Sequence, residues 1–181
     1  VIPALWRLME EQEDVALAMP KVLFLNGSVQ CLAKLLPTPV DLFCRFFMPV
    51  KLIVRRNNKF ELRHSGYDRE MNVPFLSGCF MFLRVSALKS EGIFDERFFM
   101  YMEDVDLTRR LHAKHKTLFY PSVSIYHRFS RLSYHKWKLS LAHMASVVKY
   151  FNKWGWIYDS SRRRFNKTLL KELKQQTKNE D

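Results

Sequence analysis

The sequence of 181 residues has few cysteines, few acidic residues and no long apolar run. Its cysteines, Cys31, Cys44 and Cys79, are odd in number and lack a CxxC spacing, which argues against a disulfide framework and against a zinc ribbon. No signal-peptide pattern is visible. The most apolar stretch, residues 42–54, is broken by charged residues and a proline and is shorter than the about 18–20 residues of a membrane-spanning helix. We therefore expect a cytoplasmic protein with reduced thiols.

Positive charge and aromatic residues are abundant. Hydrophobic residues make up 48% of the chain, and 15 Phe, 7 Tyr and 4 Trp predict a folded domain with a substantial core. Thirty Lys and Arg against 18 Asp and Glu give a formal charge of +12. Such a field attracts polyanions, namely nucleic acid, an anionic membrane face or phosphorylated substrates, and charge alone does not select among them.

Strand and helix patterns alternate along the chain, which predicts an α/β fold. The chain starts at Val1 inside a helical pattern, so we expect a piece of a longer protein whose missing part lies upstream. Residues 30–70 look irregular, with a polar, mobile loop over 55–70. The predicted elements are helices over 3–13, 103–115 and 133–156, strands over 15–24, 116–121 and 123–127, a strand entering a short helix over 75–88, and a basic helical tail from 160.

The tightest acidic cluster lies directly behind the aromatic run 98–102. Glu103, Asp104 and Asp106 fall in the first turn of a predicted helix, where carboxylates cap free N–H groups and complement the helix dipole. A carboxylate beside an apolar floor would instead have a raised pKa, which suits a general base. The residues alone leave both interpretations open.

The stretch "SGCFMFLRVSALKSEGIFDERFFMYMEDVDLTRRLHAKHKTLFYPSVSIYH", residues 77–127, resembles the C-terminal half of inverting family-2 glycosyltransferases with the GT-A fold. It is most similar to their rhamnosyltransferase-like branch, as is "SVVKYFNKWGW" further on. The resemblance runs through residues 1–156. One departure is Ile93, where a second glycine is common.

This resemblance implies an acceptor site. Asp104 would be the base that removes the proton of the acceptor hydroxyl, and Glu103 would line the acceptor pocket. Ser77, Gly78 and Cys79 would pass beneath the acceptor, where Gly78 permits close backbone approach. Asp106 is interpreted as structural, and the aromatic run as the wall of the site. For Cys79, a small core residue is the plainer alternative.

The resemblance also implies a donor side. His127 would hold a divalent metal, Mn²⁺ or Mg²⁺, together with a D-x-D-like motif expected upstream of Val1. Arg128 and Arg131 would close over the donor diphosphate. A satisfied strand-end histidine and solvated surface arginines are the alternatives.

We thus expect a partial GT-A fold, with residues 1–132 as the acceptor-side half of the catalytic domain and residues 133–181 as a C-terminal helical extension with a basic tail. The predicted reaction is inverting transfer of a sugar from a nucleotide-sugar donor to a glycan or lipid-linked acceptor. The setting would be bacterial surface polysaccharide assembly, such as O-antigen, capsule or exopolysaccharide, and the fragment would be inactive alone. The alternative is a non-catalytic module that binds a membrane or a partner.

The basic C-terminal region could serve either function. Trp137, Trp154 and Trp156 lie near the cluster Arg162–Arg164, a composition that suits an anionic membrane surface. The alternative is that the tryptophans pack the long helix onto the core. No motif for nucleic-acid binding accompanies the basic residues, so nucleic acid is not expected as a partner.

Overall fold

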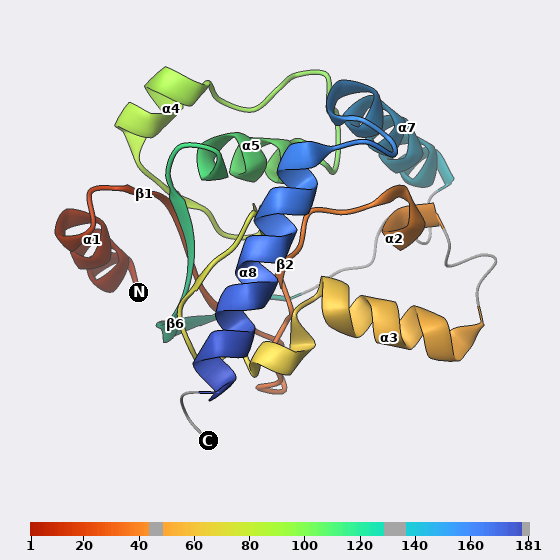
Figure 1. Cartoon of the computed structure of the whole chain (residues 1–181). Coiled ribbons are helices and arrows are strands. Elements are labelled where there is room, and N and C mark those ends of the chain that lie inside the picture. Colours follow the sequence, from red (N-terminus) through yellow and green to blue (C-terminus); the bar gives the residue numbers. More distant parts are fainter. Residues whose placement is uncertain (44–48, 129–136, 179–181) are drawn as a thin grey trace.

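The computed structural model describes residues 1–43, 49–128 and 137–178, and its elements form layers around a mixed sheet (Figure 1). The predicted α/β class is confirmed. The helices are α1 (Ile2–Glu11), α2 (Pro39–Phe43), α3 (Val50–Phe60), α4 (Val85–Glu91), α5 (Glu103–His112), α7 (Trp137–Trp154) and α8 (Ser160–Lys178), with a 3₁₀ turn η2 (Arg63–Ser65). The strands are β1 (Val15–Leu23), β2 (Ala33–Lys34), β3 (Met71–Asn72), β4 (Phe75–Leu76), β5 (Phe82–Leu83) and β6 (Lys116–Tyr126).

The central sheet has the strand order β3-β6-β1-β5, and its long strands β1 and β6 run parallel. β1 is a nearly continuous buried apolar run, as a strand covered on both faces should be. The two strands predicted over 116–121 and 123–127 are one strand, β6. Its register against β1 shifts between Pro20 and Lys21, so Pro121 lies at a bulge where no ladder hydrogen bond is needed.

Of the strand and short helix predicted over 75–88, the helix is present as α4, whereas the prediction of one continuous strand before it is wrong. β4 pairs with β2 in a separate two-stranded sheet, whereas β5 pairs with β1. Residues 77–80 are therefore a turn that joins the two sheets. This turn carries three of the predicted site residues.

The prediction of an irregular, mobile segment over 30–70 is also wrong in its second half. Residues 50–60 form α3, which has no buried residue, and η2 follows it. The buried Tyr67 anchors the end of the segment, because its hydroxyl lies 2.6 Å from the carbonyl oxygen of Ala33 and 2.7 Å from that of Glu61.

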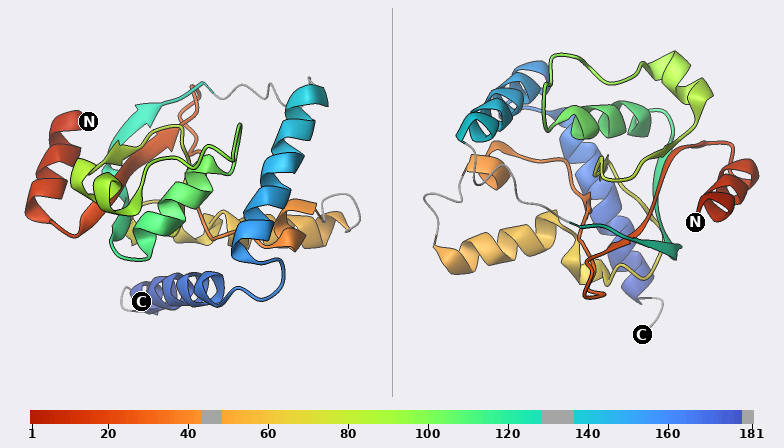
Figure 2. Two further views of the ribbon diagram at one scale, coloured as in Figure 1. Left: turned by 90° about the horizontal axis from the view of Figure 1, so that it is seen from above. Right: turned by 180° about the vertical axis from the view of Figure 1, so that it is seen from behind.

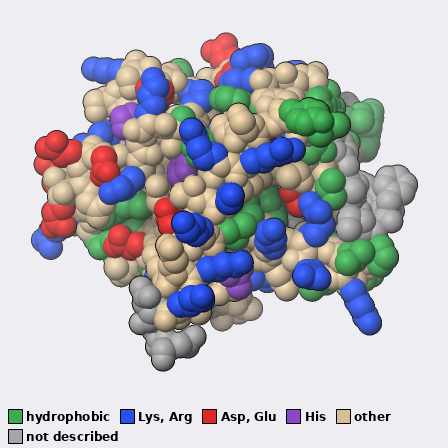
Figure 3. Space-filling view, viewed as in Figure 1, with side chains coloured by type: hydrophobic (Ala, Val, Ile, Leu, Met, Phe, Trp, Pro, Cys, Tyr) green, Lys and Arg blue, Asp and Glu red, His purple; other side chains and the backbone are tan. Residues whose placement is uncertain are grey.

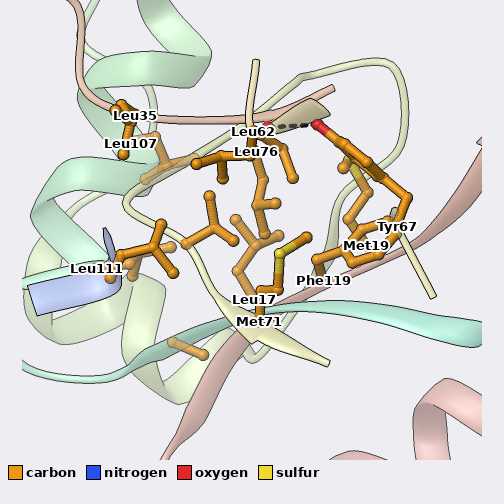
Figure 4. Close-up of a cluster of buried hydrophobic side chains, with 14 of the residues drawn as sticks. Leu17, Met19, Leu35, Leu62, Tyr67, Met71, Leu76, Leu107, Leu111 and Phe119 are labelled. Atoms are coloured by element: carbon orange, nitrogen blue, oxygen red, sulfur yellow. Dashed lines mark hydrogen bonds between the residues drawn. The ribbon is translucent and has the colours of Figure 1, made fainter. Parts of the chain in front are cut away.

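The main core lies between the sheet and the helices α5 and α8 (Figure 4). Figure 2 shows α8 lying across the side of the sheet on which α5 packs. Leu169 and Leu173 of α8 belong to the same cluster as Leu17 of β1 and Leu107 of α5. On the opposite face, α1 covers the sheet with a smaller cluster around Leu5. The C-terminal helix is thus part of the main core.

A buried carboxylate fixes α7 to α5. Asp106 is fully buried, and its Oδ1 lies 2.7 Å from both Lys153 Nζ and Trp154 Nε1 of α7. Its Oδ2 accepts a 2.9 Å hydrogen bond from Arg110 Nε, one helical turn further on. Asp106 is structural, as predicted. Lys153 also pairs with Asp95 at 2.8 Å, which ties the turn before α5 to the same helix.

A second buried ion pair fixes the start of α8. Arg109, 2% exposed, donates to both oxygens of Asp159 at 2.8 and 2.6 Å, and its guanidinium stacks 4.0 Å from the Trp154 ring centroid. Asp159 Oδ1 in turn accepts a hydrogen bond from the backbone N–H of Arg162, as a helix-capping carboxylate does.

We expect Asp106→Asn to lower the free energy of unfolding by about 3 kcal/mol, because breaking a buried ion pair leaves its cations uncompensated. Urea denaturation at neutral pH measures this. Asp14→Asn is the matched control, since the Lys116–Asp14 pair is exposed and its loss should cost at most about 1 kcal/mol. Equal effects of the two substitutions would contradict a structural role for Asp106.

Burial of His112 should make stability pH-dependent. Its Nδ1 lies 2.7 Å from Thr117 Oγ1, its ring meets Phe165 edge-on, and burial lowers its pKa from 6.5 to about 4. Between about pH 4 and pH 6.5, His112 is therefore protonated in the unfolded chain and neutral in the folded chain. The stabilisation is complete above about pH 6.5 and declines as the pH falls towards about 4.

Between pH 7 and pH 5 we expect the wild-type free energy of unfolding to fall by about 2 kcal/mol through His112. Urea denaturation of His112→Gln at both pH values should show that this part of the pH dependence is lost. The exposed His64 provides the control substitution His64→Gln, which should keep it. An unchanged slope in His112→Gln would refute this assignment.

Candidate active site

The first turn of α5 follows two residues with unusual backbone angles. Tyr101 and Met102 have φ values of +62° and +67°, which side-chain-bearing residues rarely adopt. The buried side chain of Met102 holds this step in place. Such strain persists only where the surroundings enforce it, and it clusters at functional sites. The backbone conformation of Tyr101 and Met102 sets the direction in which the chain enters α5, and with it the positions of Glu103 and Asp104.

Asp104 is held by two backbone amides. Its Oδ2 accepts a 2.8 Å hydrogen bond from the Gly78 N–H, and its Oδ1 accepts one of 2.8 Å from the Val105 N–H. A Cβ atom at Gly78 would lie 3.2 Å from the Cβ of Asp104, so the close approach requires glycine or a shift of a few tenths of an ångström. The structure thus brings the turn 77–80 and the start of α5 together.

Burial raises the pKa of Asp104, although the hydrogen bonds from Gly78 and Val105 and the positive charge of Lys34 oppose this. Burial raises the pKa of Glu103 as well, with a smaller contribution from the charge of Asp104, and the buried Glu103 Oε2 has no hydrogen-bond partner among the described residues. Both carboxyl groups are therefore better proton acceptors than exposed ones.

Cys79 and Ser77 lie beside this pair of carboxyl groups. Burial raises the pKa of the Cys79 thiol, the Asp104 charge raises it further, and a hydrogen bond with Ser77 opposes both. A thiol with a raised pKa is a poor nucleophile, so the surroundings of Cys79 do not favour nucleophilic catalysis. The predicted acceptor-side residues are all in one place, and their roles stay predictions.

Sequence reasoning missed Lys34. Its Nζ lies 5.6 Å from the ring centroid of Phe60 and 5.9 Å from that of Phe75, and it pairs with Glu61 at 3.9 Å. Pairing of β2 with β4 places Lys34 opposite Phe75, close to the turn that contacts Asp104. Two-residue strands leave no periodic pattern, so no signal in the sequence pointed to this cation.

The aromatic run before α5 supplies only part of the predicted wall. Phe98 and Met102 are buried in a cluster with Val147 and Phe151 of α7. Phe99 is 82% exposed and points away from this cluster.

The predicted donor-side residues lie elsewhere, at the end of β6. The backbone N–H of His127 donates to the carbonyl of Leu23, and its ring Nδ1 lies 3.2 Å from Gln30 Oε1. Arg128 is exposed, and Arg131 lies outside the described residues. Within residues 1–43, 49–128 and 137–178, no hydrogen bond or ion pair joins His127 or Arg128 to Asp104 or its neighbours in the site.

The described residues do not by themselves fit a divalent cation. Within those ranges no three His, Cys, Asp or Glu side chains are grouped so that they could hold a metal ion. A single imidazole is a poor site for Mn²⁺ or Mg²⁺, which prefer several oxygen ligands.

Comparisons with known proteins give a partial relationship. Two curated proteins named N-acetylglucosaminyl-diphospho-decaprenol L-rhamnosyltransferase, from Mycobacterium tuberculosis strains CDC 1551 / Oshkosh and ATCC 25618 / H37Rv, are each 48% identical to this chain over 59 residues. The match covers 32% of this chain and 19% of each relative, so the chain matches about a fifth of the relatives' length. No protein-family profile and no solved structure matches the chain. The 59-residue similarity shows a glycosyltransferase-like relationship.

Proposed function

We propose that this chain carries the acceptor side of a glycosyltransferase of the GT-A type. The proposed reaction is transfer of a sugar, with inversion, from a nucleotide-sugar donor to a hydroxyl group of a glycan or lipid-linked acceptor. The observation that carries the proposal is Asp104, a carboxylate with a raised pKa that the Gly78 N–H holds at the edge of a strained turn.

In the proposed step, Asp104 accepts the proton of the acceptor hydroxyl. The oxygen then forms a bond to the anomeric carbon of the donor sugar, and the bond from that carbon to the diphosphate breaks. The nucleoside diphosphate leaves with the electron pair, and attack from the opposite face inverts the carbon. Glu103 Oε2, buried and without a partner among the described residues, can accept a hydrogen bond from a second acceptor hydroxyl.

The substrate class rests on the relatives' name, which describes a rhamnosyl transfer to a diphospho-decaprenol-linked sugar. We propose a lipid-linked or glycan acceptor of this class, within bacterial surface polysaccharide assembly. The predicted Mn²⁺ or Mg²⁺ ion, bound by His127 with upstream carboxylates, stays a prediction for the longer protein, and no step above is assigned to it.

Asp104→Asn in the full-length protein should reduce turnover by a factor of about 10² or more, because an amide cannot take up the proton. The amide oxygen can still accept one of the two backbone hydrogen bonds, so the variant should remain folded, with a melting temperature lowered by the loss of the other. Asp68→Asn, at an exposed position, is the control and should retain activity. Turnover near the wild-type rate in Asp104→Asn would refute the assignment. A folded wild type that transfers no sugar from any nucleotide donor would favour the non-catalytic module.

We also propose that the protein associates with a membrane, but through a surface that differs from the one predicted from the sequence. Arg162 is buried, with its guanidinium bound to backbone carbonyls such as that of Trp156, so it does not belong to a membrane-facing cluster. Trp154 is likewise engaged with Asp106. Among the described residues no helix is long and apolar enough to cross a membrane.

The surface we propose lies on α7 and the loop that follows it. Leu141, Met144 and Val148 form an exposed apolar stripe along α7, and Tyr158 in the loop is 85% exposed beside Arg163. Figure 3 shows hydrophobic side chains on the α7 side of the molecule. Residues 137–158 contain no acidic residue, and since Lys153 is paired with Asp95 and Asp106, the exposed Lys149 and Arg163 supply the positive charge here. Positive charge beside exposed apolar groups matches an anionic lipid surface, whereas two such surfaces would repel each other in a dimer.

Co-sedimentation with phosphatidylglycerol vesicles should show binding that fades as salt is added. Each cation near the surface contributes about 1 kcal/mol, so the double variant Arg163→Ser/Arg164→Ser should bind about tenfold or more weakly. The control double variant Lys114→Ser/Lys116→Ser removes one cation from the turn after α5 and one from the first residue of β6, and it should bind as the wild type does. Protein that stays in the supernatant at low salt would refute the membrane proposal.

A further inference from the structure

Gln30 is a buried polar residue that the proposed reaction leaves unused. It is 3% exposed and follows β1 after the turn at 24–28. Its Nε2 donates to the carbonyl oxygens of Leu23, at 3.1 Å, and His127, at 2.6 Å. Its Oε1 lies 3.2 Å from His127 Nδ1. The side chain therefore spans the carboxyl ends of the parallel strands β1 and β6.

These contacts fix the orientation of the Gln30 amide. Two carbonyl oxygens face one end of the amide, and a carbonyl oxygen can only accept a hydrogen bond. The rotated amide would place Oε1 against both of them; the Leu23 carbonyl would keep the hydrogen bond from the His127 N–H, but the His127 carbonyl would exchange its 2.6 Å donor for a repulsive oxygen–oxygen contact. The NH₂ group must therefore face Leu23 and His127, and Oε1 must face the ring.

The tautomer of His127 follows from this orientation. Because Oε1 cannot donate, the Nδ1 atom of His127 must carry the hydrogen in their contact. In the neutral ring Nε2 then has no hydrogen and a free lone pair. Nε2 has no hydrogen-bond partner within residues 1–43, 49–128 and 137–178. In open α/β sheets, ligands bind outside the carboxyl ends of the strands, which is where this nitrogen lies.

We propose that Gln30 is a positioning residue that holds neutral His127 as the Nδ1–H tautomer, so that the lone pair of Nε2 is free on the substrate side of the sheet. The neutral ring cannot then donate a hydrogen bond from Nε2 to a phosphate oxygen. A hydrogen bond from the other ring nitrogen is also what orients histidines that use one nitrogen as a ligand. The tautomer of His127 does not depend on the proposed function. Only the statement that Nε2 lies on the substrate side rests on it.

Long-range ¹H–¹⁵N correlation spectra of this chain at pH 8 identify which ring nitrogen of each histidine is protonated. We expect the Nδ1–H pattern for His127. His112 is an internal reference for the same pattern, because Thr117 Oγ1 gives its hydrogen to the Val73 carbonyl and so accepts one from His112 Nδ1. The exposed His64 should show the Nε2–H tautomer that prevails in free histidine. An Nε2–H pattern at His127 would overturn the proposal.

Gln30→Met removes the amide and retains an unbranched side chain of similar length. In this variant His127 should move to the Nε2–H pattern while His112 keeps its own. An unchanged His127 in a folded variant would show that Gln30 does not set the tautomer.

The full-length protein supplies a second readout. If Gln30 acts through His127, Gln30→Met should add little to the loss of transfer activity caused by His127→Ala, whereas independent residues give multiplied losses. Multiplied losses would overturn the positioning role. If the wild type shows no transfer at all, the proposed function fails, but the nitrogen spectra still decide the tautomer.

Discussion

The arrangement of the helices depends on one buried carboxylate, Asp106. It has no exposure to solvent, and Arg110, Lys153 and Trp154 donate to its two oxygens. A charge buried in this way is tolerated only if cations and hydrogen bonds replace the lost water. Part of the positive charge of the chain is therefore used inside the fold, where it connects α5 to α7.

The position of the candidate base follows from this connection. Asp104 and Asp106 are two residues apart, so they lie about 200° apart around α5 and face different surroundings. Asp106 faces α7, and Asp104 faces the turn at Gly78. Since Arg109 also fixes α5 to the start of α8, the helix that presents Asp104 is held from two sides. A general base must be positioned within a fraction of an ångström, and these buried ion pairs supply that rigidity.

The sequence allowed prediction of the elements with clear periodicity and not of those defined by long-range contacts. α1, β1, α5 and α7 each carry an apolar pattern of the right period, and their existence was predicted. α3 was missed because Pro49, which precedes the first turn of the helix, was interpreted as a break in an irregular segment. β2, β4 and β5 have two residues each, too few for any pattern.

The same distinction holds for the site. The acidic residues at 103 and 104 stand out in the sequence, but the hydrogen bond from Gly78 to Asp104 was not predicted, since the resemblance placed Gly78 only beneath the acceptor. Lys34 is placed near Asp104 by β2–β4 pairing, and Gln30 is placed against His127 by the end of β6; no local pattern indicates either position. Arg162 was assigned to the surface because three arginines in a row are usually solvated. Arg162 is buried because backbone carbonyls of the preceding loop accept hydrogen bonds from its guanidinium, and no local sequence pattern predicts these contacts.

The chemistry of Asp104 is decided by a competition between opposing effects. It lies in the first turn of α5, where the helix dipole favours a negative charge, and two N–H groups and the charge of Lys34 favour it as well. All of these lower the pKa of a carboxyl group, yet the pKa of Asp104 is raised because burial outweighs them. The hydrogen bonds then serve mainly to orient the carboxylate, while desolvation makes it basic. A general base requires both properties, and at this site they come from different physical sources.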